Sequence, residues 1–90
     1  MKRCNIYVSG RVQGVFFRAF IKENADMLGL SGFVKNLDDG RVEVIVEGSE
    51  DKIEQLIEKI KQGPPRAKVD DVSVTWEEAR GEFKGFNVKL

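Results

Sequence analysis

Apolar and polar residues alternate in three segments of the first half of the chain, as in β-strands that bury one face. Residues 2–9 place Cys4, Ile6 and Val8 on one side. Residues 32–37 and 41–47 predict a second and a third strand. Between these two, Asp38-Asp39-Gly40 is typical of a hairpin turn, with glycine where the backbone needs a positive φ.

Two other segments repeat apolar residues at helical spacing. Residues 17–28 predict a helix that ends at Gly29, and its buried positions are Phe17, Phe20, Ile21, Ala25 and Leu28. Ser49 is a suitable N-cap for a second helix, which Gly63-Pro64-Pro65 ends. The buried stripe of this second helix is Ile53, Leu56, Ile57 and Ile60.

Two further strands complete the pattern. Val72, Val74 and Trp76 mark the fourth, with Trp76 expected in the core, and Phe86, Val88 and Leu90 mark a short last one. The order βαββαβ plus a terminal strand predicts an α+β, ferredoxin-like sandwich. We expect one domain over residues 1–90, with a mainly antiparallel sheet, two helices on one face and an extra C-terminal strand.

The predicted topology brings distant polar residues together. A right-handed crossover returns the second strand parallel to the first. The loop after the first strand and the end of the second strand therefore lie at the same edge of the sheet. Arg18 and Asn36 both belong to that edge.

The charge is balanced overall but uneven along the chain. Lysine plus arginine and aspartate plus glutamate each number 15. The first 22 residues carry five bases and no acid, whereas residues 36–60 carry eight acids and three bases. A neutral chain argues against nucleic-acid or anionic-membrane partners. The basic first quarter is compatible with a small anionic ligand.

Histidine is absent, which excludes Ser-His-Asp and Cys-His catalysis and histidine-ligated metals. The single cysteine, Cys4, cannot form an internal disulfide, and no segment resembles a signal peptide or a membrane span. We therefore expect a cytoplasmic protein in which Cys4 is a buried apolar residue.

The segment Gly10-Arg11-Val12-Gln13-Gly14-Val15-Phe16-Phe17-Arg18 joins the first strand to the first helix. Glycines allow successive N–H groups to converge on an oxyanion, and the helix adds its positive end. Arg18 can grip a phosphoryl group with two donors. The segment matches neither a P-loop nor a Rossmann fingerprint. Taken alone, two glycines and an arginine after a strand are more often a tight turn beside a surface charge.

Two long motifs resemble the acylphosphatase family. Residues 8–18, Val-Ser-Gly-Arg-Val-Gln-Gly-Val-Phe-Phe-Arg, are similar to its first signature. Residues 32–42, Gly-Phe-Val-Lys-Asn-Leu-Asp-Asp-Gly-Arg-Val, running on to Gly48, are similar to its second. Residues 63–69 and the ending Phe83…Phe86-Asn87-Val88 also resemble the family, so the likeness covers the whole chain.

The resemblance implies hydrolysis of the carboxyl–phosphate bond of small acyl phosphates, without metal or cofactor. It places the substrate-binding arginine at Arg18 and the water-positioning asparagine at Asn36. It assigns the phosphate-cradling loop amides to Arg11, Val12, Gln13, Gly14 and Val15. We expect a monomer that binds the acyl phosphate and its phosphate product.

Two rival functions use the same architecture. An RRM would need aromatic residues on the third strand, and residues 41–48 contain none. A phosphate or metabolite sensor would keep the anion-binding loop without needing Asn36. Release of phosphate from acetyl phosphate separates the enzyme from the sensor.

Overall fold

The computed structural model describes all 90 residues. The elements, in chain order, are β1 (Lys2–Arg11), α1 (Phe17–Met27), β2 (Ser31–Asn36), β3 (Val42–Gly48), α2 (Glu50–Gln62), β4 (Lys68–Glu78) and β5 (Phe86–Lys89). This order confirms the predicted βαββαβ arrangement with an added C-terminal strand.

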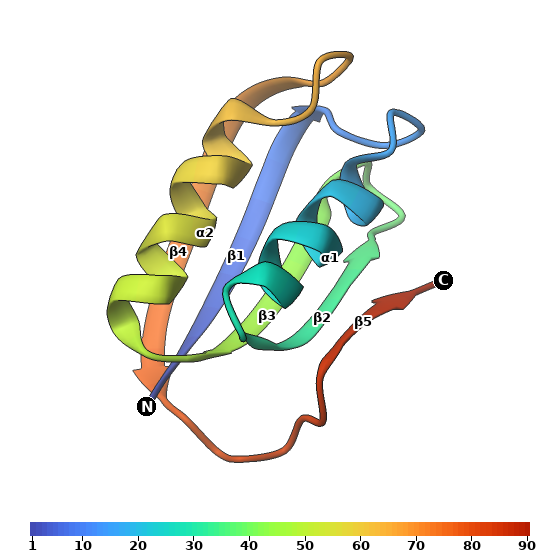
Figure 1. Cartoon of the computed structure of the whole chain (residues 1–90). Helices are drawn as coiled ribbons and strands as arrows, with labels where there is room; N and C mark the ends of the chain where they lie inside the picture. The colour runs from blue at the N-terminus through green and yellow to red at the C-terminus, as the bar shows by residue number, and fades with distance from the viewer.

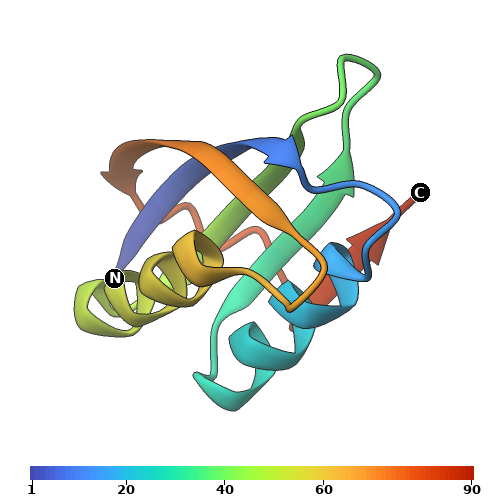
Figure 2. The same ribbon diagram turned by 90° about the horizontal axis from the view of Figure 1, so that it is seen from above.

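The strands form one sheet in the order β4-β1-β3-β2-β5 (Figure 1). β1 pairs antiparallel with both β3 and β4, and β2 pairs antiparallel with β3. β5 adds to the outer edge of β2 in parallel. Both helices lie on one face of this sheet (Figure 2), so the predicted two-layer α+β sandwich is confirmed.

The hydrophobic core fills the space between the sheet and the two helices. The predicted inward faces of the strands and helices are buried there, among them Cys4, Ile6, Val8, Phe17, Ile21, Ala25, Val42, Val44, Val46, Ile53, Leu56 and Ile60. Burial raises the pKa of the Cys4 thiol to about 11, so it stays protonated near neutral pH.

The helix ends follow the predicted signals closely. Gly29 follows α1 with φ 69°, and the Leu30 N–H donates to the Ala25 carbonyl, as in a left-handed helix terminus. Ser49 precedes α2 in an extended conformation, although its side chain makes no capping hydrogen bond. Neither helix has the length and hydropathy needed to cross a lipid bilayer.

The structure corrects two expectations about the strands. Trp76 is not in the core: it is 40% exposed, because β4 is an edge strand that the helices cover only in part. β1 does not end at Ser9 but continues to Arg11 through an irregularity at Ser9/Gly10. Gly10 permits this with φ 124°, and its Cα lies too close to the Lys68 carbonyl to carry a side chain.

A buried carboxylate anchors the connection between β4 and β5. Glu47 accepts hydrogen bonds from the backbone N–H groups of Arg80 (2.8 Å) and Gly81 (3.0 Å), and pairs with Arg3 at 3.3 Å. The segment leading to β5 is thereby held against the sheet. This contact was not predicted, because Glu47 ends a strand whose alternation alone does not indicate a partner.

We predict that Gly32→Ala destabilises the protein by at least about 2 kcal/mol in urea unfolding. Gly32 has φ 142°, and an added Cβ would overlap the Ile45 carbonyl of the neighbouring strand. Gly40→Ala is the matched control, since Gly40 has φ 97° but nothing within 4 Å of its Cβ position. Equal losses in the two variants would show that the close strand approach contributes nothing.

Candidate active site

The loop between β1 and α1 presents free backbone donors. No hydrogen bond to another protein group has its donor in the backbone N–H groups of residues 12–16. Gly14 has φ 71°, and the loop leads directly into the N-terminus of α1, whose first turn contains no acidic residue. Unpaired amides next to a helix N-terminus form a site for an anion.

Three side chains fix the conformation of this loop. Val12 is buried in the core, and Val15 packs against it. The Gln13 side-chain amide donates to the carbonyls of Leu37 (2.8 Å) and Arg41 (2.9 Å), at the base of the turn between β2 and β3. These two hydrogen bonds tie the loop to that turn.

Phe16 occupies an unusual position where the loop meets the helix. It is the only non-glycine residue with positive φ (62°), and it is 78% exposed. The left-handed conformation costs such a residue about 1–2 kcal/mol. Its carbonyl accepts from the Phe20 N–H and begins the hydrogen bonding of α1. The predicted buried positions that follow it are in the core, Phe17 fully and Phe20 partly.

Arg18 lies in the first turn of α1, and its side chain is oriented by the end of the chain. Its Nη1 donates to the Lys89 carbonyl at 2.9 Å. The remaining guanidinium N–H groups donate to no protein acceptor. Arg18 can therefore use its other donors for a ligand while β5 holds its orientation.

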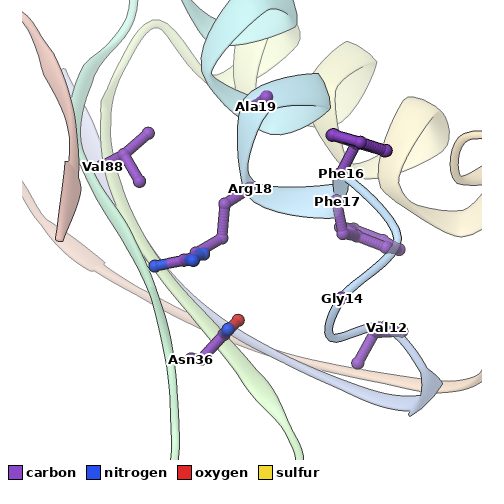
Figure 3. A pocket seen from close by; sticks show the side chains of 8 residues that line it. All are labelled: Val12, Gly14, Phe16, Phe17, Arg18, Ala19, Asn36 and Val88. Atoms are coloured by element: carbon purple, nitrogen blue, oxygen red, sulfur yellow. The ribbon is translucent and has the colours of Figure 1, made fainter. Parts of the chain in front are cut away.

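Asn36, the last residue of β2, carries an amide that is free of protein partners. Its Oδ1 is buried without a hydrogen-bond partner. Buried polar atoms are rarely left unpaired, and a bound ligand or water can satisfy them. In Figure 3 the side chains of Asn36 and Arg18 extend into the same space from different elements.

One cavity of about 340 Å³ unites these features. It is lined by Val12, Gly14, Phe16, Phe17, Arg18, Ala19, Asn36 and Val88. Arg18 is the only charged side chain in this lining. The cavity therefore has an apolar part and a second part in which the Arg18 cation and several hydrogen-bond donors lie.

The predicted site residues are not all placed alike. Val12, Gly14, Arg18 and Asn36 line the cavity, whereas Gln13 and Val15 support the loop from behind. Arg11 lies in β1 opposite Lys68 and is exposed, outside the cavity lining. Sequence analysis missed the Lys89 carbonyl and Val88, because only the parallel pairing of β5 with β2 brings them here.

The surrounding charges favour a small anion. Arg11 and Lys35 make no ion pair, so their charges remain available. Arg41, by contrast, is engaged by Asp39 at 2.8 Å and lies over the Tyr7 ring at 5.0 Å. The Arg41 backbone N–H holds the pKa of the Asp39 carboxyl below its ordinary value. No group of three or more Asp, Glu or Cys side chains comes together to hold a metal ion.

Comparison with known proteins gives one consistent family. The acylphosphatase family model matches residues 4–88. An acylphosphatase of Rubrobacter xylanophilus is 50% identical over 88 residues, covering 98% of this chain and 80% of that protein. One of Pyrobaculum islandicum is 48% identical over 87 residues, covering 96% and 92%.

The same likeness holds in three dimensions. The crystal structure of acylphosphatase from Bacillus subtilis superimposes with a TM-score of 0.97 at 43% identity, covering all of both chains. Family model, sequence and fold thus agree over nearly the full length, which favours an enzyme over a phosphate sensor. The chain belongs to the acylphosphatase family and is an enzyme that hydrolyses acyl phosphates.

Proposed function

We propose that Arg18 and the loop amides hold the phosphoryl group of a small acyl phosphate while Asn36 orients the attacking water. The observation that carries this proposal is the unpaired donor set of residues 12–16, which shares one cavity with Arg18 and the free Asn36 amide. The products are a carboxylate and inorganic phosphate.

Phosphoryl transfer depends mainly on positioning and on stabilising charge at the equatorial oxygens. The loop amides and Arg18 supply this charge stabilisation. The Lys89 carbonyl keeps the guanidinium oriented before substrate arrives. Less reorganisation is then needed when charge develops in the transition state.

The reaction needs no general acid. The water oxygen forms a bond to phosphorus as the bond to the acyl oxygen breaks, and the leaving carboxylate has a pKa of about 4. Such a group departs without protonation. Because an amide is too weak a base, the proton of the water passes to a phosphoryl oxygen of the substrate. This route is compatible with a chain that has no histidine.

The first test is phosphate release from acetyl phosphate in the presence of a chelator. We expect undiminished turnover, with competitive inhibition by inorganic phosphate. Because substrate rather than enzyme carries the titrating group, the pH profile near neutrality should follow the ionisation of the substrate. Tight phosphate binding without hydrolysis would instead support a sensor.

Two substitutions should separate binding from turnover. Arg18→Ala should raise KM and lower kcat, whereas Asn36→Ala should lower kcat roughly 10²–10³-fold with a smaller change in KM. Steady-state kinetics on acetyl phosphate provide both numbers. Arg80→Ala is the control, because the Arg80 side chain pairs with Glu77 outside the cavity. Full activity in folded Asn36→Ala would refute the role of Asn36.

Gln13 is proposed as a positioning residue. Gln13→Ala removes both hydrogen bonds to the turn, so we expect kcat/KM to fall about tenfold and the affinity for inorganic phosphate to fall with it. Hydrogen exchange of the amides from Val12 to Val15 should also become faster. Gln62→Ala, at the exposed end of α2, serves as control. Unchanged phosphate affinity in Gln13→Ala would show that the loop holds its shape without this clamp.

A further inference from the structure

β5 supplies the acceptor that orients Arg18, yet this strand has few contacts of its own. It is four residues long, lies at one edge of the sheet and pairs only with β2. Phe86 is buried, whereas Asn87, Val88 and Lys89 are exposed. A short, exposed edge strand is the kind of segment that opens locally at a low cost in free energy. The orientation of Arg18 therefore depends on the other contacts that keep β5 in place.

A second cation of α1 also binds a backbone carbonyl of β5. The Lys22 Nζ donates to the Phe86 carbonyl at 2.9 Å, just as the Arg18 Nη1 donates to the Lys89 carbonyl at 2.9 Å. Arg18 and Lys22 are one helical turn apart, so they lie on the same face of α1. β5 passes beside α1 (Figure 2) and packs against it. The two side chains thus hold the strand at its first and its last residue.

Lys22 makes one further contact, which lies within the helix. Its Nζ is 2.9 Å from the Asp26 Oδ2, and both side chains are about half-exposed. Exposed ion pairs between neighbouring helical turns contribute little to stability. The hydrogen bond to Phe86 is partly buried, and its charged donor makes it stronger than a bond between neutral groups. We therefore expect the contact with β5, rather than the ion pair, to be the one on which the site depends.

The two hydrogen bonds divide the work of holding β5. The buried Phe86 ring fixes where the strand begins, and the bond from Lys22 fixes how the peptide group of the same residue is turned. No other side chain of α1 hydrogen-bonds to the strand. Without Lys22, the Arg18 guanidinium would be the only helical donor that holds β5, while it also has to bind the phosphoryl group.

We propose that Lys22 is a positioning residue for the reaction: by fixing the first residue of β5, it keeps the Lys89 carbonyl where that carbonyl orients Arg18. This inference rests on the proposed function, in which Arg18 binds the phosphoryl group. Lys22 lies outside the cavity lining, so it acts on the substrate only through the strand and Arg18. Its contribution is a guanidinium that is already oriented when the substrate arrives, which reduces reorganisation in the transition state.

The test compares the wild type with Lys22→Met, which keeps an unbranched side chain but has no donor. We expect kcat to fall and KM for acetyl phosphate to rise, as in Arg18→Ala but less, so that kcat/KM falls roughly three- to tenfold. Hydrogen exchange of the β5 backbone amides should become faster, and nitrogen-15 relaxation should show a more mobile Arg18 Nε. Lys22→Arg, which keeps a charged donor, should retain most of the wild-type kcat/KM.

Asp26→Asn is the matched control, because it removes the ion pair within α1 and leaves the hydrogen bond from Lys22 to Phe86. We expect wild-type kinetics in this variant. The double variant Lys22→Met with Asp26→Asn has the same net charge as the wild type and should be as impaired as Lys22→Met. Recovery of wild-type kinetics in the double variant would show that only the charge of Lys22 mattered, which would overturn the proposal.

Two other results would overturn it as well. One is an equal loss of kcat/KM in Asp26→Asn and Lys22→Met, since Lys22 would then act through the helix alone. The other is unchanged kcat and KM in folded Lys22→Met while Arg18→Ala is impaired, which would leave the proposed function standing. Wild-type kinetics in Arg18→Ala itself would overturn the proposed function and this inference together.

Discussion

The two hydrogen bonds from the Gln13 side chain are the contacts on which the geometry of the site depends most directly. They tie the β1–α1 loop to the Leu37 and Arg41 carbonyls beside the end of β2. Backbone donors on one segment and the Asn36 amide on the other are thus held in one frame. Without these two hydrogen bonds, the loop with its unpaired amides would sample more conformations. Fewer of them would be ready to bind the phosphoryl group.

The distribution of charged residues is compatible with an anionic substrate at the β1–α1 loop. Of the five bases in the first 22 residues, Arg11 and Arg18 lie beside the loop, whereas Lys2 and Arg3 lie at the opposite end of β1 and pair with acids there. The two helices show the same division, because α2 has Glu50 and Asp51 in its first turn and α1 has no acid there. An acidic first turn stabilises a helix, whereas its absence leaves the positive end of α1 available to an anion. The neutral total therefore conceals a cavity whose only charged lining residue is the cation Arg18, which suits a small anionic substrate.

Periodicity predicted the elements and most of the core, because β1 and β2 bury alternate residues and β3 places Val42, Val44 and Val46 in the same core. It failed at Trp76, since alternation indicates which face a side chain takes but not whether a helix covers that point. It also ended β1 too early, because a glycine can mark either a loop or a bulge. Within the site, Arg18 and Asn36 could be named from motifs, whereas the contributions of Val88 and the Lys89 carbonyl depend on β5 pairing with β2, a non-local contact that no local pattern encodes.

The hydrogen bond between Arg18 and the Lys89 carbonyl links residues 71 positions apart in a chain of 90. The guanidinium therefore takes its final orientation only after the last strand has docked, however early β1 and α1 form. During synthesis the site stays incomplete until β5 has left the ribosome. Turnover should thus report the docking of β5 as well as the formation of the loop, because the carbonyl that orients the arginine belongs to that strand.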